Sequence, residues 1–180
     1  MLDRYHALAA RIDAFFARVA ARHGDELACA PGCDGCCRQR LTVTGVEAAA
    51  IRAWAATRPS AERAAIAAAA RTAPADRCAA LGDDGRCRIY AARPLVCRSH
   101  GVPVRLRDPR GLPVVTACEL NFSARGPAAA DPDCVLDQEL VSTMLALVDR
   151  EHASSRDVAP DRHDLAGLLA ALDPPGARAP

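Results

Sequence analysis

The sequence Cys-Ala-Pro-Gly-Cys-Asp-Gly-Cys-Cys occupies residues 29 to 37 and holds four of the nine cysteines of the chain: Cys29, Cys33, Cys36 and Cys37. Thiolates two or three residues apart in a turn converge on one soft cation, and the Pro-Gly and Asp-Gly pairs between them favour turns. Adjacent cysteines do not easily present both sulfurs to one tetrahedral ion. The stretch therefore predicts one side of a metal site. Either one of its two final cysteines binds metal while the other packs as a small apolar side chain, or both are ligands of a two-metal or cluster site.

The other five cysteines lie far apart along the chain, at Cys78, Cys87, Cys97, Cys118 and Cys134. A site that uses them has to be closed by long-range contacts, so a bound metal would staple the fold. Free cysteine is among the most buried residue types, and Cys134 lies outside the compact pattern. We expect core packing rather than metal ligation for Cys134.

Composition excludes some classes of function. The 180 residues are 51% apolar, which is enough for one domain with a real core, and the formal net charge is +1. A net charge this close to zero gives no excess of basic residues for binding phosphate groups, so we expect no nucleic-acid partner. All basic residues besides histidine are arginine, which together with the abundant alanine fits codon bias.

Targeting features are also missing from the pattern. The first residues carry no basic segment followed by an apolar run, and the alanine-rich stretch at 64 to 70 is too short for a membrane span. We expect a cytoplasmic protein with no membrane partner. In a reducing compartment, clustered cysteines are more often metal-binding or redox-active than disulfide-bonded.

Hydrophobic periodicity predicts a mainly α fold, a single domain over 1–180, in which helices pack around an irregular cysteine-rich metal-binding centre with one short β-hairpin. The N-terminal helix is expected within 1–24, and the capping box that begins at Thr44 opens a second helix to about residue 57. Ser60 is expected to cap a third helix to about residue 71. The remaining predictions are a hairpin over 102–106 and 112–116, a cysteine-cluster core over 29–122, C-terminal helices over 134–172 with Asp161 capping the last, and a frayed tail over 174–180.

A second motif lies at residues 87 to 98, where the sequence reads CRIYAARPLVCR, and a later cysteine begins the stretch Cys-Glu-Leu-Asn-Phe at 118 to 122. With the first cysteine block, these stretches resemble the YkgJ-type CxxCxxCC cysteine-cluster family, described as zinc- or iron-chelating. The resemblance spans residues 29 to 122. The family motif has two residues between its first two cysteines, whereas this chain has three between Cys29 and Cys33.

The resemblance implies eight metal-associated cysteines. They are Cys29, Cys33, Cys36, Cys37, Cys78, Cys87, Cys97 and Cys118. Arg93 and Arg98 flank Cys97, and they are expected either to offset thiolate charge or to pair with ordinary carboxylates. His100 is a weaker ligand candidate, because the cysteines already suffice. His23, His152 and His163 are interpreted as helix-associated side chains, with His163 in the first turn of the last helix.

No hydrolytic constellation, P-loop or zinc-protease motif is present, so the pattern favours a metal-binding protein over an enzyme. Zinc or iron, held as a structural staple or as cargo, at two centres or one polynuclear site, is the first hypothesis. The second is an iron–sulfur protein for electron transfer or redox sensing, and the third a copper(I) buffer or chaperone. Metal ions are thus the only partners that the sequence suggests, and it says nothing of protein partners.

Overall fold

The computed structural model describes residues 2–173, and its elements are mostly helices joined by irregular segments. These residues divide into two compact units that each combine segments distant in sequence. The first unit contains 3–30 and 94–148, and the second contains 31–93 and 149–173. The mainly α fold with a cysteine-rich irregular region is confirmed. The tail expected over 174–180 lies outside the described residues.

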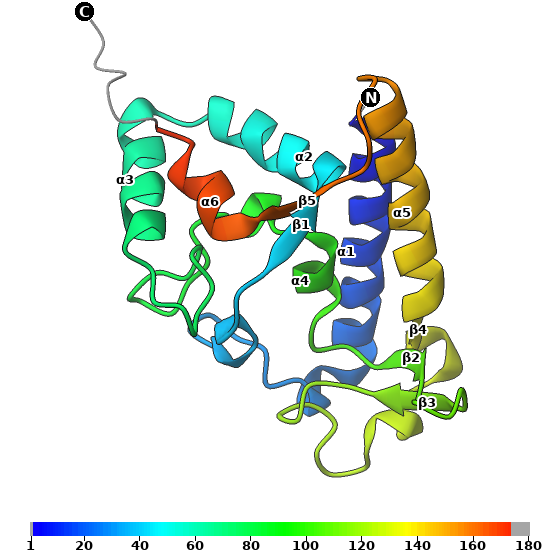
Figure 1. Cartoon of the computed structure of the whole chain (residues 1–180). Coiled ribbons are helices and arrows are strands. Elements are labelled where there is room, and N and C mark those ends of the chain that lie inside the picture. Colours follow the sequence, from blue (N-terminus) through cyan, green and yellow to red (C-terminus); the bar gives the residue numbers. More distant parts are fainter. Residues whose placement is uncertain (1, 174–180) are drawn as a thin grey trace, which may run out of the picture. The chain divides into compact units, whose positions relative to one another are not determined.

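The first unit is built on a long amphipathic helix, α1 (Asp3–His23), with a buried stripe that includes Tyr5, Leu8, Ile12 and Val19. The spacing of these side chains follows the helical period, which confirms the N-terminal helix. The short helix α4 (Leu95–Ser99) packs against α1. The longer α5 (Gln138–Ser154) begins in this unit, and its part in the unit runs beside α1 (Figure 1).

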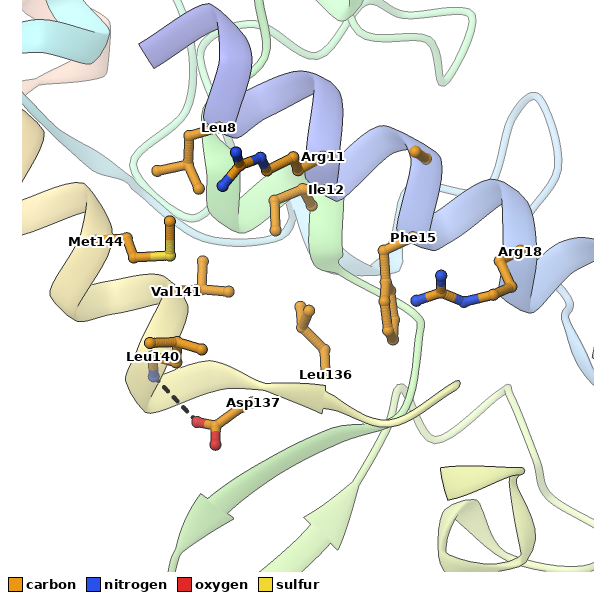
Figure 2. Close-up of a pocket in the computed structure, with 11 residues that line it drawn as sticks. Leu8, Arg11, Ile12, Phe15, Arg18, Leu136, Asp137, Leu140, Val141 and Met144 are labelled. Atoms are coloured by element: carbon orange, nitrogen blue, oxygen red, sulfur yellow. Dashed lines mark hydrogen bonds between the residues drawn. The ribbon is translucent and has the colours of Figure 1, made fainter. Parts of the chain in front are cut away.

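Between α1 and the first turns of α5 lies a shallow apolar hollow of about 290 Å³ (Figure 2). Ile12 and Phe15 line it from α1, and Val141 and Met144 line it from α5. No cysteine lines this hollow. It is therefore separate from the cysteine groups described below.

The predicted hairpin is confirmed as β2 (Val104–Arg107) and β3 (Pro113–Thr116), which pair antiparallel with Val104 opposite Thr116. Its turn is held by Asp108, whose carboxylate accepts hydrogen bonds from the Arg110 and Leu112 N–H groups, both at 2.9 Å. A third strand, β4 (Leu136–Asp137), pairs parallel with β2.

The helix expected from residue 134 begins later than predicted, because residues 132 to 137 form other contacts. Pro132–Cys134 is a 3-10 turn, and the Leu136 N–H donates to the Pro103 carbonyl at 2.8 Å. Asp137 then accepts from the Leu140 N–H at 3.0 Å and so caps α5. Pairing with β2 therefore competes with the helical period of this segment.

The second unit contains β1 (Thr42–Thr44), α2 (Gly45–Ala56), α3 (Ser60–Arg71), β5 (Arg162–Asp164) and α6 (Leu165–Ala170). Strands β1 and β5 pair antiparallel, and α3 packs against α6 (Figure 1). The apolar core of this unit includes Val43, Ile51, Ile66, Ile89, Leu165 and Leu169, together with Cys78. Other 3-10 turns of the chain are Gly24–Glu26, Gly35–Cys37, Tyr90–Ala92 and Pro127–Ala129.

Two helix starts in the second unit differ from the sequence-based prediction. The last helix is capped by Asp164, which accepts from the Gly167 N–H at 2.9 Å, and not by Asp161. His163 consequently lies in β5 opposite Val43, because residues 162–164 are held by strand pairing. Helix α3 has Pro59 at its N-cap, so Ser60 is its first residue and makes no capping bond.

None of the helices in the part of the chain that the structure describes is both long and apolar enough to cross a membrane.

The capping box of α2 offers a test of local stability. Thr44 Oγ1 accepts from the Glu47 N–H at 3.5 Å, and the Glu47 carboxylate accepts from the Thr44 N–H at 2.9 Å. Thr44 is buried, so Thr44→Ala should lower the free energy of unfolding by about 1 kcal/mol in chemical denaturation. Ser60→Ala is the matched control, and an equal loss in both variants would contradict the assignment.

Candidate metal centre

The loop at residues 33 to 37 belongs to the second unit and is as rich in turns as its sequence predicts. The Cys37 N–H donates to the Asp34 carbonyl at 2.8 Å, which closes the 3-10 turn Gly35–Cys37. Cys33 is exposed, whereas Cys36 and Cys37 are half-buried. The turn therefore directs its last two cysteines inward and leaves the first at the surface.

Cys78 joins this loop to the apolar core. Its N–H donates to the Cys37 carbonyl at 2.7 Å, and its side chain is buried in the core of the second unit. Cys87 follows through a short antiparallel bridge with Leu81, which the Arg88 N–H reinforces by donating to the Ala80 carbonyl at 2.8 Å. Backbone hydrogen bonds thereby close the segment at 78–88 on itself and tie it to the cysteine loop, which is distant in sequence.

The pKa values of these cysteines show that their sulfurs influence one another. A hydrogen bond with Cys36, then burial, then the charges of Cys36, Cys78 and Cys87 raise the pKa of Cys37 far above its ordinary value. Burial first, and the charges of neighbouring cysteines after it, raise the pKa values of Cys78 and Cys87. We call Cys36, Cys37, Cys78 and Cys87 the thiol cluster.

Such a cluster is suited to a cation. Ionisation of Cys37, Cys78 and Cys87 is unfavourable because burial and the charges of neighbouring cysteines both oppose it, and a bound metal ion would offset both effects. Cys36 and Cys37 also hydrogen-bond through their side chains, so adjacency in sequence does not keep their sulfurs apart. The donor set is all thiolate, which suits zinc, copper(I) and iron–sulfur centres.

Two arginines supply positive charge to the thiol cluster. The charge of Arg40 opposes the rise in the pKa of Cys78, and the charge of Arg93 opposes the rise in the pKa of Cys87. The Arg93 guanidinium also lies over the Tyr90 ring, 3.9 Å from its centroid. The expectation that Arg93 offsets thiolate charge is therefore supported by its effect on Cys87.

Arg98 occupies a different environment. Its side chain is buried in the first unit, and Nη1 donates to the Asp13 carboxylate of α1 at 2.5 Å. This contact is the ordinary carboxylate pairing that the sequence left open. It ties α4 to α1 and thereby positions the segment that carries Cys97.

Cys29 lies in the first unit, and Asn121 holds the chain beside it. The Asn121 side chain accepts from the Ala28 N–H at 2.8 Å, and its Nδ2 donates to the Gly101 carbonyl at 2.7 Å and to Cys29 Sγ at 3.3 Å. Asn121 is only 3% exposed. A Cβ on Gly101, which has φ of +102°, would lie 2.7 Å from Cys29 Sγ, so this close approach requires glycine.

The stretch after Cys118 explains how Asn121 reaches this position. The Asn121 N–H donates to the Cys118 carbonyl at 2.9 Å, and the following Phe122 has φ of +54°. Phe122 is buried, and its N–H donates to the Glu26 carbonyl at 2.8 Å. The sequence motif thus contains a positioning residue, Asn121, that sequence analysis did not identify. A polar side chain between Leu120 and Phe122 was the available signal.

The structure therefore separates the predicted ligands by unit. The thiol cluster and the exposed Cys33 lie in the second unit, and Cys29, Cys97 and Cys118 lie in the first. Cys134 is fully buried in the first unit, in agreement with the burial expected of it.

Comparison with known families supports a metal-binding segment. Residues 28–111 match the family model CxxCxxCC, whose description reads "Putative zinc- or iron-chelating domain". The resemblance seen in the cysteine spacing is thereby confirmed over a little less than half of the chain. No curated protein and no solved structure matches the chain.

The clamp formed by Asn121 can be tested by substitution. Asn121→Ala should leave the Ala28 N–H and the Gly101 carbonyl unsatisfied, which costs about 3 kcal/mol of unfolding free energy. Asn121→Asp keeps the acceptor for Ala28 and loses the donor, so a smaller loss is expected. Chemical denaturation measures both, and a wild-type midpoint for Asn121→Ala would contradict the role.

A pair of glycines tests the packing of the cysteine loop. Gly85 has φ of +73°, and a Cβ there would lie 3.1 Å from the Gly32 carbonyl oxygen, whereas Gly111 has φ of +82° with nothing within 4 Å. Gly111→Ala should cost about 1 kcal/mol from backbone strain alone. Gly85→Ala should cost more and should also weaken metal binding. Equal losses in denaturation would show that the approach of Gly85 to Gly32 is unimportant.

Proposed function

We propose, from the match of residues 28–111 to a zinc- or iron-chelating domain, that this protein holds a metal ion through the thiol cluster. The observation that carries the proposal is that the charges of neighbouring cysteines in one unit raise the pKa values of Cys37, Cys78 and Cys87. Four thiolates are the ligand number of a closed tetrahedral site.

The other family cysteines complete the proposed ligand set. Cys33 lies in the same loop as Cys36 and Cys37, while Cys29, Cys97 and Cys118 belong to the first unit. Eight thiolates exceed what one tetrahedral ion accepts. Two metal centres or one polynuclear site therefore fit the number of donors.

Zinc is our first choice for the metal, with iron second. The complex of Zn²⁺ with four thiolates has a formal charge of about −2, and the positive charges of Arg40 and Arg93 at the cluster offset part of this negative charge. All-thiolate coordination leaves no position for substrate, so the proposal is metal binding and not catalysis.

An iron–sulfur cluster is the second candidate because of the surroundings of the thiols. Cys78 is buried beside Ala79, Ala80 and Leu81, and Ile89 is fully buried next to the Cys87 segment. Apolar shielding of this kind excludes water, which tunes the potential of such clusters. A copper(I) buffer stays the third candidate on the softness of thiolate alone.

The proposed role of the metal is that of a structural staple. The segments around Cys36, Cys78 and Cys87 contain turns and single backbone bridges rather than long helices or strands. An ion shared among three such segments would supply cross-links that the backbone lacks. A cargo role would instead require an ion that leaves without unfolding the protein.

Metal analysis of protein purified without air separates the candidates. We expect stoichiometric zinc and no colour. Stoichiometric iron with acid-labile sulfide and a broad sulfur-to-iron charge-transfer absorption would favour the iron–sulfur candidate. Nine freely titrating thiols and no metal would refute the proposal.

Substitution within the cluster tests its ligands. Cys78→Ser should lose the cluster metal and lower the thermal midpoint, because one of four thiolates is removed from a shared ion. Ile66→Val is the matched control from the same core and should cost about 1 kcal/mol without loss of metal. Chelation of the wild-type protein should reproduce the destabilisation of Cys78→Ser. An unchanged midpoint after complete metal removal would favour cargo over a staple.

A further inference from the structure

Outside the residues that match the family model, the first unit brings together three side chains of different chemistry. His23, Asp131 and Cys134 each offer one ligand atom, and these atoms all lie within 4.8 Å of one another. They form the one such group, among the described residues, that satisfies this separation. We call these residues the mixed triad.

The triad is assembled by local backbone structure and charge. His23 is the last residue of α1, and Asp131 and Cys134 are joined by a turn in which the Cys134 N–H donates to the Asp131 carbonyl at 2.8 Å. Arg22 Nη1 lies 2.6 Å from the Asp133 carboxylate and 3.5 Å from the Asp131 carboxylate. These contacts hold the turn against the end of α1.

The imidazole presents an acceptor nitrogen to the turn. The Asp131 N–H donates to His23 Nε2 at 3.4 Å, and the Asp131 carboxylate oxygen lies 3.6 Å from the same nitrogen. This hydrogen bond is long and therefore weak, so a metal ion can take the place of the Asp131 N–H at His23 Nε2. The separation of 3.6 Å is close to the roughly 3.4 Å between nitrogen and oxygen ligands of a tetrahedral zinc ion, given metal–ligand distances of about 2.1 Å.

Burial decides between two uses of a Cys-His-Asp group. Cys134 is completely buried and His23 is 6% exposed, whereas the Asp131 side chain is 52% exposed. A nucleophilic cysteine needs access to substrate, and the sulfur here has none. The exposed Asp131 side chain places one ligand of the group at the surface, which suits the binding of a small ion.

We propose that the mixed triad is a second type of metal site, which binds one divalent ion, Zn²⁺ in the first place, through sulfur, nitrogen and oxygen. Three protein ligands leave a fourth position on the exposed Asp131 side, which water fills. One thiolate and one carboxylate neutralise the ion, and Arg22 already balances Asp133 beside them. The site is independent of the thiol cluster because it shares no residue with it.

Zinc content at a fixed free zinc concentration tests the proposal on the full chain. The wild-type protein should hold one more equivalent than Cys134→Ala and than Asp131→Asn. Asp131→Asn alters an exposed side chain, so it should fold even if Cys134→Ala does not. Loss of one ligand should weaken zinc binding at this site by about 100-fold, measured in competition with a chelating indicator. This is the upper end of the effect of mutating a residue that supports a metal ligand.

The control is Glu139→Gln, which removes an exposed carboxylate of the same unit that pairs with Arg107 and takes no part in the triad. It should keep the wild-type zinc content. Cys78→Ser separates the two proposals, since it should lose the ion of the thiol cluster and keep the ion of the mixed triad. Wild-type zinc content and affinity in both Asp131→Asn and Cys134→Ala would overturn the mixed triad as a site, whatever Cys78→Ser shows.

Discussion

The hydrogen bond from the Cys78 N–H to the Cys37 carbonyl joins the cysteine loop to the apolar core of the second unit. Around it, the charges of Cys36, Cys78 and Cys87 raise the pKa of Cys37, and the charge of Cys36 also raises the pKa values of Cys78 and Cys87. Burial among apolar side chains makes uncompensated thiolates costly, so this arrangement favours a cation. The packing of the core and the proposed chemistry thus depend on the same contact.

In the first unit, a buried side chain holds an exposed cysteine, Cys29, in a defined place. Asn121 uses both ends of its amide, so that Ala28, Cys29 and Gly101 are held by one buried side chain. Gly101 allows this approach because any side chain would meet the sulfur. Polar groups buried in this way are rigid, since each loses a partner if the geometry changes.

Prediction from the sequence was most successful where the signal was local. The helical period of α1, the capping box at Thr44 and the turn between β2 and β3 depend on residues a few positions apart, and the structure confirms them. It was least successful where a distant strand competed. Residues 136–137 pair with β2 and residues 162–164 pair with β1, so both helices start later than their apolar period indicated.

The candidate site divides in the same manner. Soft metals prefer thiolate ligands, so the presence and spacing of the cysteines are enough to indicate thiolate chemistry and the resemblance to the family. Only tertiary packing determines which thiols lie near one another. The same holds for the clamp by Asn121 and for the meeting of His23 with Asp131 and Cys134. Those contacts span up to more than a hundred residues of chain, and no local pattern encodes such a separation. The residue types therefore indicate which chemistry is available, and the tertiary structure determines which residues come together to perform it.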